Sequence, residues 1–146
     1  MSTKTEIAAG TLLSGYNCAQ SVVHAFRDEA DLDEDLALKI ATGLGVGMGR
    51  KQEVCGAVTG GILVLGLRHG RGRTESRSTT EQTYLKTREL MDRFSIKHGS
   101  CLCRQLLQGY DLATEEGQRR AKADDMLNIV CRPCVQTVVE ILEQIN

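Results

Sequence analysis

An uncharged run near the middle of the chain limits the fold more than any other feature. Residues 54–67 read VCGAVTGGILVLGL and contain no charged side chain. Gly56 and Gly60 are four residues apart and therefore share one face of a helix, as do Ala57 and Gly61. A helical face without side chains lets a second backbone approach closely. The run predicts a buried helix with Cys55 at its beginning.

Chain length and charge restrict the class of protein. A chain of 146 residues is long enough for one domain with its own core and too short for two, so we expect a single domain over residues 1–146. The formal net charge is −1, which gives no long-range attraction to nucleic acid or to an anionic membrane. We therefore expect no nucleic-acid partner.

The sequence has no pattern typical of export or of membrane insertion. Its first residues lack the apolar segment and the small-residue cleavage site of a signal peptide, so we expect a cytoplasmic protein. The longest uncharged run has about 14 residues, fewer than the roughly 20 that a membrane-spanning helix needs. We expect no membrane span.

Helical periodicity recurs along the whole chain. Apolar residues follow one another at helical spacing after Cys18, after Asp33 and after Cys131, and Asn17, Asp33 and Thr114 suit helix N-caps. No segment shows the alternation of a strand. We therefore predict an all-α fold, a single helical bundle of about six or seven helices. The expected helical segments are residues 6–13, 18–26, 33–44, 54–67, 76–97, 114–126 and 131–142, with one or two further turns within residues 100–109.

Residues 43–51 carry glycine at positions 43, 45, 47 and 49. The dinucleotide-binding fingerprint needs a preceding strand and a glycine at its sixth position, whereas here a helix precedes the glycines and Met48 takes that position. We therefore predict a flexible or tightly turned connection that brings the backbone close to Cys55, and not a nucleotide site.

The chain has six cysteines. In a reducing compartment, metal binding or redox chemistry is a more common use of several cysteines than structural disulfides, although single cysteines also fill apolar cores. Four of them lie at or just before predicted helix starts: Cys18, Cys55, Cys131 and Cys134. Free N–H groups and the helix dipole at such positions stabilise a thiolate, which is both a nucleophile and a metal ligand. The other two, Cys101 and Cys103, lie on a connection between helices.

Four motifs occur in a characteristic order: NCAQSV at residues 17–22, CGAVTGG at residues 55–61, CRQLL at residues 103–107, and a cysteine ahead of the apolar C-terminal helix. Together they resemble the C_GCAxxG_C_C family, whose members are described as redox-active, over nearly the whole chain. Domains similar to this family occur in electron-transfer proteins. The resemblance implies that the four characteristic cysteines are here Cys18, Cys55, Cys103 and Cys131. Cys101 and Cys134 are additional candidates, because each lies beside one of the four.

Three uses of these cysteines are open from the sequence. In the first, an iron–sulfur cluster or another metal is bound, and the protein transfers electrons. The ligands would be the four cysteines of the resemblance, Cys18, Cys55, Cys103 and Cys131. In the second, two cysteines cycle between dithiol and disulfide without a metal. The spacing of residues 131–134 suits this exchange, and Cys18 and Cys55 are further candidates for it.

In the third use, zinc stabilises a structural or interaction module. Its ligands would be Cys101, Cys103, Cys131 and Cys134, which leaves the other two cysteines without a role. If the protein is an enzyme, we expect an oxidoreductase. His24 lies on the helix after Cys18, but a lone helical histidine is more often a packing or surface residue than a ligand.

The partners follow from the same argument. A redox carrier needs a redox partner protein, whose identity the sequence does not give. The glycine face of residues 54–67 would favour a homodimer if no element of the chain covers it.

Overall fold

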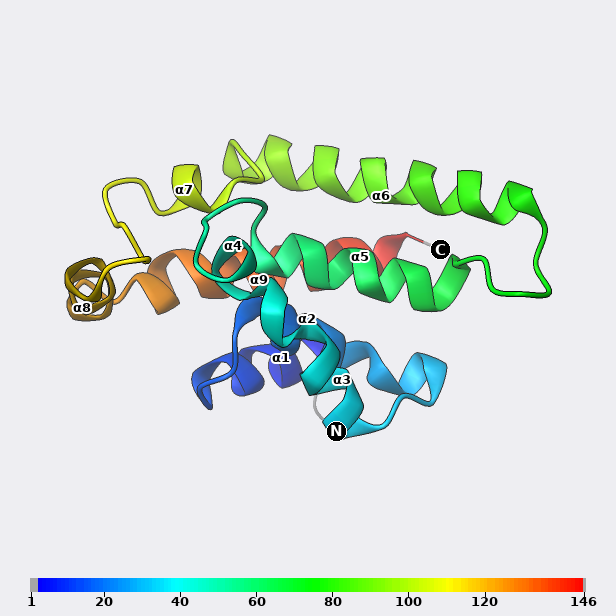
Figure 1. Cartoon of the computed structure of the whole chain (residues 1–146), viewed down its shortest axis with the longest axis horizontal. Helices are drawn as coiled ribbons and strands as arrows, with labels where there is room; N and C mark the ends of the chain where they lie inside the picture. The colour runs from blue at the N-terminus through cyan, green and yellow to red at the C-terminus, as the bar shows by residue number, and fades with distance from the viewer. Residues whose placement is uncertain (1–2, 146) are drawn as a thin grey trace.

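The protein is described by a computed structural model over residues 3–145, in which helices follow one another through short connections (Figure 1). The first half contains α1 (Lys4–Leu13), α2 (Cys18–Phe26), α3 (Glu34–Ala41), α4 (Gly45–Met48) and α5 (Gly56–His69). Two 3₁₀ turns, η1 (Arg27–Ala30) and η2 (Thr42–Leu44), follow α2 and α3. The second half contains α6 (Arg77–His98), α7 (Cys103–Leu106), α8 (Glu115–Ala123), the π-helical turn η3 (Leu127–Cys131) and α9 (Arg132–Gln144).

The all-α fold is confirmed, since residues 3–145 contain no β-strand. The described chain nevertheless has more helices than the six or seven expected. Two helices have only four residues each: α7 lies within residues 100–109, where one or two turns were expected, whereas α4 lies where a loop was expected. A single turn is too short for the apolar repeat that identifies a helix in a sequence.

The predicted N-caps are in place. In a capping box, Gln20 N–H donates to Asn17 Oδ1 and Asn17 N–H donates to Gln20 Oε1, both at 2.9 Å. Asp33 Oδ2 accepts a hydrogen bond from the first turn of α3 at 3.1 Å, and Thr114 Oγ1 accepts one from the first turn of α8 at 3.0 Å. These caps fix where α2, α3 and α8 begin.

The last helix begins earlier than predicted. The chain is already helical in η3, where Arg132 N–H bonds to the carbonyl of Leu127 across a π turn, and α9 continues with Pro133 in its first turn. Cys131 is therefore preceded by helix, and the expectation that it stands at a free helix N-terminus is wrong. The sequence between residues 113 and 131 is too polar to show where one helix stops and the next starts.

Helix α5 is the central element, with α6 running along one side, α9 behind it, and α1, α2 and α3 on the opposite side (Figure 1). Glycine allows the crossing with α2, because a Cβ at Gly60 would lie 2.8 Å from the carbonyl oxygen of Ala19. A Cβ at Gly61 would meet side chains of α6 and α9 at 2.9 and 2.8 Å. The chain itself thus covers the glycine face of α5, which removes the argument for a dimer through that face.

The apolar core surrounds α5. Its largest fully buried side chains include Phe26, Phe94, Leu12, Leu65 and Leu90, which come from α2, α6, α1 and α5. None of the helices within residues 3–145 combines the length and the apolar character that crossing a bilayer requires.

Candidate functional site

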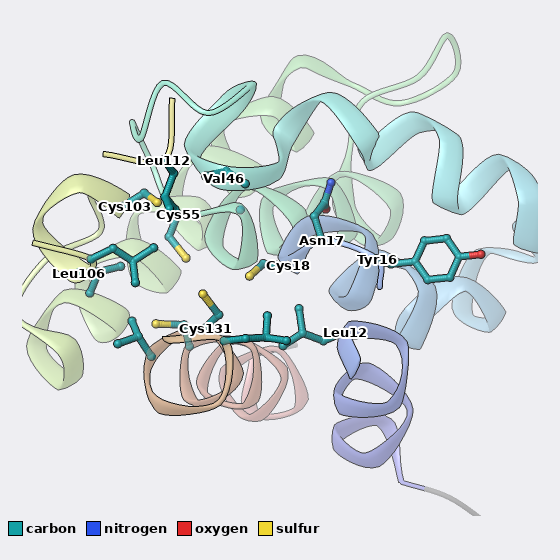
Figure 2. A pocket seen from close by; sticks show the side chains of 15 residues that line it. Leu12, Tyr16, Asn17, Cys18, Val46, Cys55, Cys103, Leu106, Leu112 and Cys131 are labelled. Atoms are coloured by element: carbon teal, nitrogen blue, oxygen red, sulfur yellow. The ribbon is translucent and has the colours of Figure 1, made fainter. Parts of the chain in front are cut away.

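An apolar cavity of about 120 Å³ lies where several helices begin, and five of the six cysteines line it. Figure 2 shows the sulfur atoms of Cys18, Cys55 and Cys131 directed into the same space. The cysteines on its wall are Cys18, Cys55, Cys103, Cys131 and Cys134. Most of the other lining side chains are leucine and valine, and no charged residue of the described chain contributes to the wall.

The cysteines reach the cavity from four parts of the fold. Cys18 is the first residue of α2, and Cys55 directly precedes α5. Cys103 is the first residue of α7, while Cys131 ends η3 and Cys134 follows in the first turn of α9. The site is therefore assembled by tertiary packing, which explains why the cysteines are far apart in the sequence.

A short backbone pairing holds the Cys55 and Cys103 connections together. Cys55 N–H donates to the carbonyl of Cys101, and Cys103 N–H donates to the carbonyl of Glu53, both at 2.7 Å. This is an isolated antiparallel bridge between Val54 and Leu102. Because backbone atoms make the pairing, the positions of the two cysteines do not depend on flexible side chains.

One wall of the cavity rests on a backbone in an uncommon conformation. Val46, Met48 and Arg50 have φ values of 53°, 69° and 68°, and Gln52 has 54°. Each such residue costs about 1–2 kcal/mol relative to ordinary backbone, and a β-branched residue such as Val46 is a clear outlier. The prediction of a tight turn near Cys55 is confirmed, and Val46 itself lines the cavity.

Gln52 anchors this strained loop. Its side chain is 7% exposed, donates to the carbonyl of Tyr110 at 3.0 Å and accepts from the N–H of Leu112 at 2.9 Å. The carbonyl of Gln52 accepts from the backbone N–H of Arg104 at 3.0 Å and from its Nε at 3.2 Å. Arg104 also forms an ion pair with Glu53. These contacts hold the loop against α7, where Cys103 begins.

Cys18 and Cys131 are neighbouring thiols on the cavity wall. A hydrogen-bonding interaction with Cys131 is the main cause that raises the pKa of Cys18, with burial and the charges of neighbouring sulfur atoms acting in the same direction. The same bond lowers the pKa of Cys131, against the opposing effect of burial and of Cys55. Of the two, Cys131 is therefore the sulfur that loses its proton more readily, while Cys18 remains the thiol that donates to it.

Cys55 and Cys134 form a second pair of the same kind. The hydrogen bond with Cys134 lowers the pKa of Cys55, burial opposes it, and the N–H groups of Ala57 and Val58 at the start of α5 lower it further. The bond and the burial of Cys134 raise the pKa of that thiol. Cys55 is 6% exposed and Cys134 is 1% exposed, so this pair is shielded from solvent.

The two remaining cysteines differ from the pairs. Burial, with the charges of Cys55 and Cys131, raises the pKa of Cys103 to about 12, so Cys103 stays a thiol. Cys101 does not line the cavity. Its sulfur lies 3.1 Å from Ser95 Oγ and 3.3 Å from the carbonyl of Met91.

The structure brings together the four cysteines named by the resemblance, namely Cys18, Cys55, Cys103 and Cys131. It also adds Cys134 to them and leaves Cys101 outside. The sequence contains a signal for Cys134, since residues three apart lie on one face of a helix and Cys131 faces the cavity. Helical spacing gives no comparable signal for Cys103 over Cys101, and that choice came from the CRQLL motif of the resemblance.

The expectation that helix starts favour thiolates holds for only one of the four cysteines, since the pKa of Cys134 is raised as well. Cys55 receives backbone N–H groups at the start of α5, as expected. The pKa of Cys18 is raised despite its place in a first turn, because its thiol donates to Cys131 and is buried. The pKa of Cys131 is lowered by that thiol and not by a helix N-terminus.

His24 has no place in the site. Its Nδ1 lies 2.8 Å from Thr11 Oγ1 and its Nε2 lies 3.1 Å from Glu34 Oε2, so it joins α2 to α1 and α3. Within residues 3–145, no three side chains of His, Cys, Asp or Glu are arranged to hold one metal ion. The cavity cysteines are arranged as two pairs and a fifth thiol.

Comparison with known proteins agrees with this cysteine pattern. The family model described as "Putative redox-active protein (C_GCAxxG_C_C)" matches residues 16–145. Neither a curated protein nor a solved structure matches the chain. Because the matched segment contains all of the cavity cysteines and nearly the whole chain, the protein belongs to the C_GCAxxG_C_C family.

Proposed function

We propose that the protein is a thiol redox carrier in which Cys18 and Cys131 interconvert between a dithiol and a disulfide. The observation that carries this proposal is that Cys18 and Cys131 face each other at one apolar cavity (Figure 2), where each shifts the pKa of the other. Both residues are partly exposed, unlike Cys55, Cys103 and Cys134. A thiol of lowered pKa with a second thiol beside it, on residues that reach the surface, is the arrangement that thiol–disulfide exchange requires.

The reaction partner is a disulfide of another protein. The Cys131 thiolate attacks one sulfur of that disulfide, the partner's S–S bond breaks, and one partner thiolate leaves. Cys131 is then neutral and no longer accepts a hydrogen bond from the Cys18 thiol. The interaction that raised the pKa of Cys18 is thereby lost, and the proton moves to the departing partner thiolate.

The second step closes the protein's own disulfide. The Cys18 thiolate attacks the sulfur of Cys131, and the second partner sulfur leaves as a thiolate, the partner having gained two electrons. In the net reaction the protein loses two electrons and its partner's disulfide becomes a dithiol. The exchange is reversible, so its direction depends on the two reduction potentials.

The test is to map disulfides after oxidation with an excess of oxidised glutathione. We expect the reduced protein to give a peptide linked through Cys18 and Cys131, and to return to the dithiol with a reducing agent. Cys101→Ser is the matched control, because Cys101 lies outside the cavity. It should behave like the wild type, whereas Cys18→Ser and Cys131→Ser should lose the linked peptide. Absence of that peptide from the oxidised wild type and from Cys101→Ser would refute the proposal.

A metal centre is the second candidate function. Cys18, Cys55, Cys103 and Cys131 line one cavity with only sulfur as strong donor, and four thiolates are the usual ligands of an iron–sulfur cluster. Such a cluster would make the protein an electron-transfer protein. The cysteines fit in number and chemistry but not in arrangement, since no three of the described ligand side chains surround one point. Binding would therefore require the pairs to move together.

A zinc module has less support. The set of Cys101, Cys103, Cys131 and Cys134 includes the one cysteine that does not line the cavity. The thiol of Cys101 is instead held beside Ser95 and the carbonyl of Met91. Zinc content that depends on Cys101 would support this module, and zinc content unchanged in Cys101→Ser would oppose it.

A further inference from the structure

The two cysteine pairs of the cavity differ in accessibility. Cys18 and Cys131 are partly exposed, whereas Cys55 and Cys134 are 6% and 1% exposed. We call the first the outer pair and the second the inner pair. Only the residues of the outer pair reach the surface, so a disulfide of another protein would meet this pair first. If the inner pair takes part in redox chemistry, it must exchange with the outer pair.

We propose that Cys55 and Cys134 form a second redox couple, which reduces the Cys18–Cys131 disulfide by internal exchange. This inference rests on the proposed function of the outer pair and extends it. It assigns a role to Cys134, which lies outside the four cysteines of the family resemblance.

Contacts between the two pairs support the exchange. Gly56, the residue after Cys55, packs directly on the outer pair, because a Cβ there would lie 3.4 Å from the Cβ of Cys18. On the opposite wall, Cys131 and Cys134 are three residues apart, separated by about one helical turn. All four line the same cavity, and Figure 2 shows Cys18, Cys55 and Cys131 facing one another there. No side chain has to cross the core for the pairs to meet.

The order of steps follows from these contacts. The Cys55 sulfur, which accepts hydrogen bonds from the N–H groups of Ala57 and Val58, attacks Cys18, against which the neighbouring Gly56 packs. The Cys18–Cys131 bond breaks and a Cys55–Cys18 bond forms, with Cys131 leaving as a thiolate.

The last step returns the outer pair to its reduced form. Cys134 attacks the sulfur of Cys55, a Cys55–Cys134 disulfide forms, and Cys18 leaves as a thiolate that takes the proton of Cys134. One disulfide has replaced another, and two electrons have passed from the inner to the outer pair. No external oxidant or reductant is consumed. The reduced outer pair can then reduce a second partner disulfide, so the protein holds four electrons in all.

The experiment oxidises fully reduced protein, without oxygen, with an excess of oxidised glutathione, followed by thiol counting and peptide mapping. We expect the wild type and Cys101→Ser to lose four thiols and to contain both the Cys18–Cys131 and the Cys55–Cys134 peptides. Cys134→Ala should lose two thiols and keep only the Cys18–Cys131 peptide. In Cys131→Ser and Cys18→Ser, the inner disulfide should form at least tenfold more slowly, because its route through the outer pair is gone.

The outcomes separate the two proposals. If the wild type forms Cys18–Cys131 alone, the inner couple is refuted while the proposed function stands. If the inner disulfide forms as fast in Cys131→Ser and Cys18→Ser as in the wild type, the exchange route is refuted. If neither the wild type nor Cys134→Ala forms Cys18–Cys131, the proposed function fails as well. Far-UV circular dichroism of each variant shows whether it keeps the helical fold, and two independent outer-pair variants guard against misfolding of one.

Discussion

Two glycines of α5 provide a matched test of the packing that places Cys18 beside Cys55. A Cβ at Gly60 would lie 2.8 Å from the oxygen and 2.9 Å from the Cα of Ala19, both backbone atoms that cannot rotate away. A Cβ at Gly66 would meet nothing within 4 Å. Both glycines lie inside the same helix, so alanine changes helix propensity equally at the two positions. Only the contact with α2 differs.

The structure predicts that Gly66→Ala and Gly60→Ala change the free energy of unfolding in opposite directions. Alanine is favoured over glycine inside a helix by about 1 kcal/mol, so Gly66→Ala should raise the free energy of unfolding by about that amount. Overpacking costs about 1–3 kcal/mol, and the upper half of that range applies where a helix backbone must shift. Gly60→Ala should therefore lower the free energy of unfolding by about 1–2 kcal/mol after the gain in propensity. In a chain of this size each 1 kcal/mol moves Tm by about 2–4 °C.

The assay is urea unfolding under reducing conditions, followed by far-UV circular dichroism. The slope of the unfolding free energy against urea should stay the same in both variants, because the exposed surface does not change. If Gly60→Ala proves as stable as Gly66→Ala, α2 does not cross α5 at Gly60. The reasoning that puts Cys18 and Cys55 in one cavity would then be refuted.

Three further predictions concern the wall of the cavity and its thiols. Gly47→Ala should lower the free energy of unfolding by about 2–5 kcal/mol, because φ is +61° and a Cβ would lie 2.5 Å from the backbone nitrogen of Glu53. Gly49→Ala is the matched control: its φ is +63° but a Cβ would meet nothing within 4 Å, so it should lower the free energy of unfolding by only about 1–2 kcal/mol. Equal urea midpoints for the two variants would contradict the loop geometry. Gln52→Ala should lower the free energy of unfolding by about 2–4 kcal/mol, because the carbonyl of Tyr110 and the N–H of Leu112 lose their hydrogen-bond partner. A variant as stable as the wild type would show that Gln52 does not anchor the loop. Alkylation of Cys131 by iodoacetamide, followed by peptide mass spectrometry, should begin at a lower pH than for an ordinary thiol, because the pKa of Cys131 is lowered. Cys18→Ala removes the thiol that lowers this pKa and should move the onset of alkylation to higher pH. An unchanged onset would show that Cys18 and Cys131 do not interact.

The helices were predictable because their signals are local. Asn17, Asp33 and Thr114 mark helix starts through the hydrogen bonds of their own side chains, and the uncharged run around Gly60 marks the element that others must cross. The run of positive φ values at Val46, Met48 and Arg50 was not predictable. Nothing in these side chains favours that conformation, which the surrounding fold imposes.

The site was predictable in part. Motif order indicated Cys18, Cys55, Cys103 and Cys131, and the structure places all four on one cavity. Which thiols become partners depends on tertiary packing, so the pairing of Cys55 with Cys134 could not be read from the chain. The pKa directions depended on that pairing too, which is why the expectation from helix starts was wrong for Cys18.

The measurement that tests the central claim most directly is made on protein purified without oxygen. It combines metal and sulfide content, the visible absorption spectrum, and a count of free thiols before and after mild oxidation. The account predicts a colourless protein without stoichiometric metal, whose Cys18 and Cys131 thiols are lost on oxidation and recovered on reduction. Visible absorption together with stoichiometric iron and sulfide would contradict it and would establish the metal centre instead.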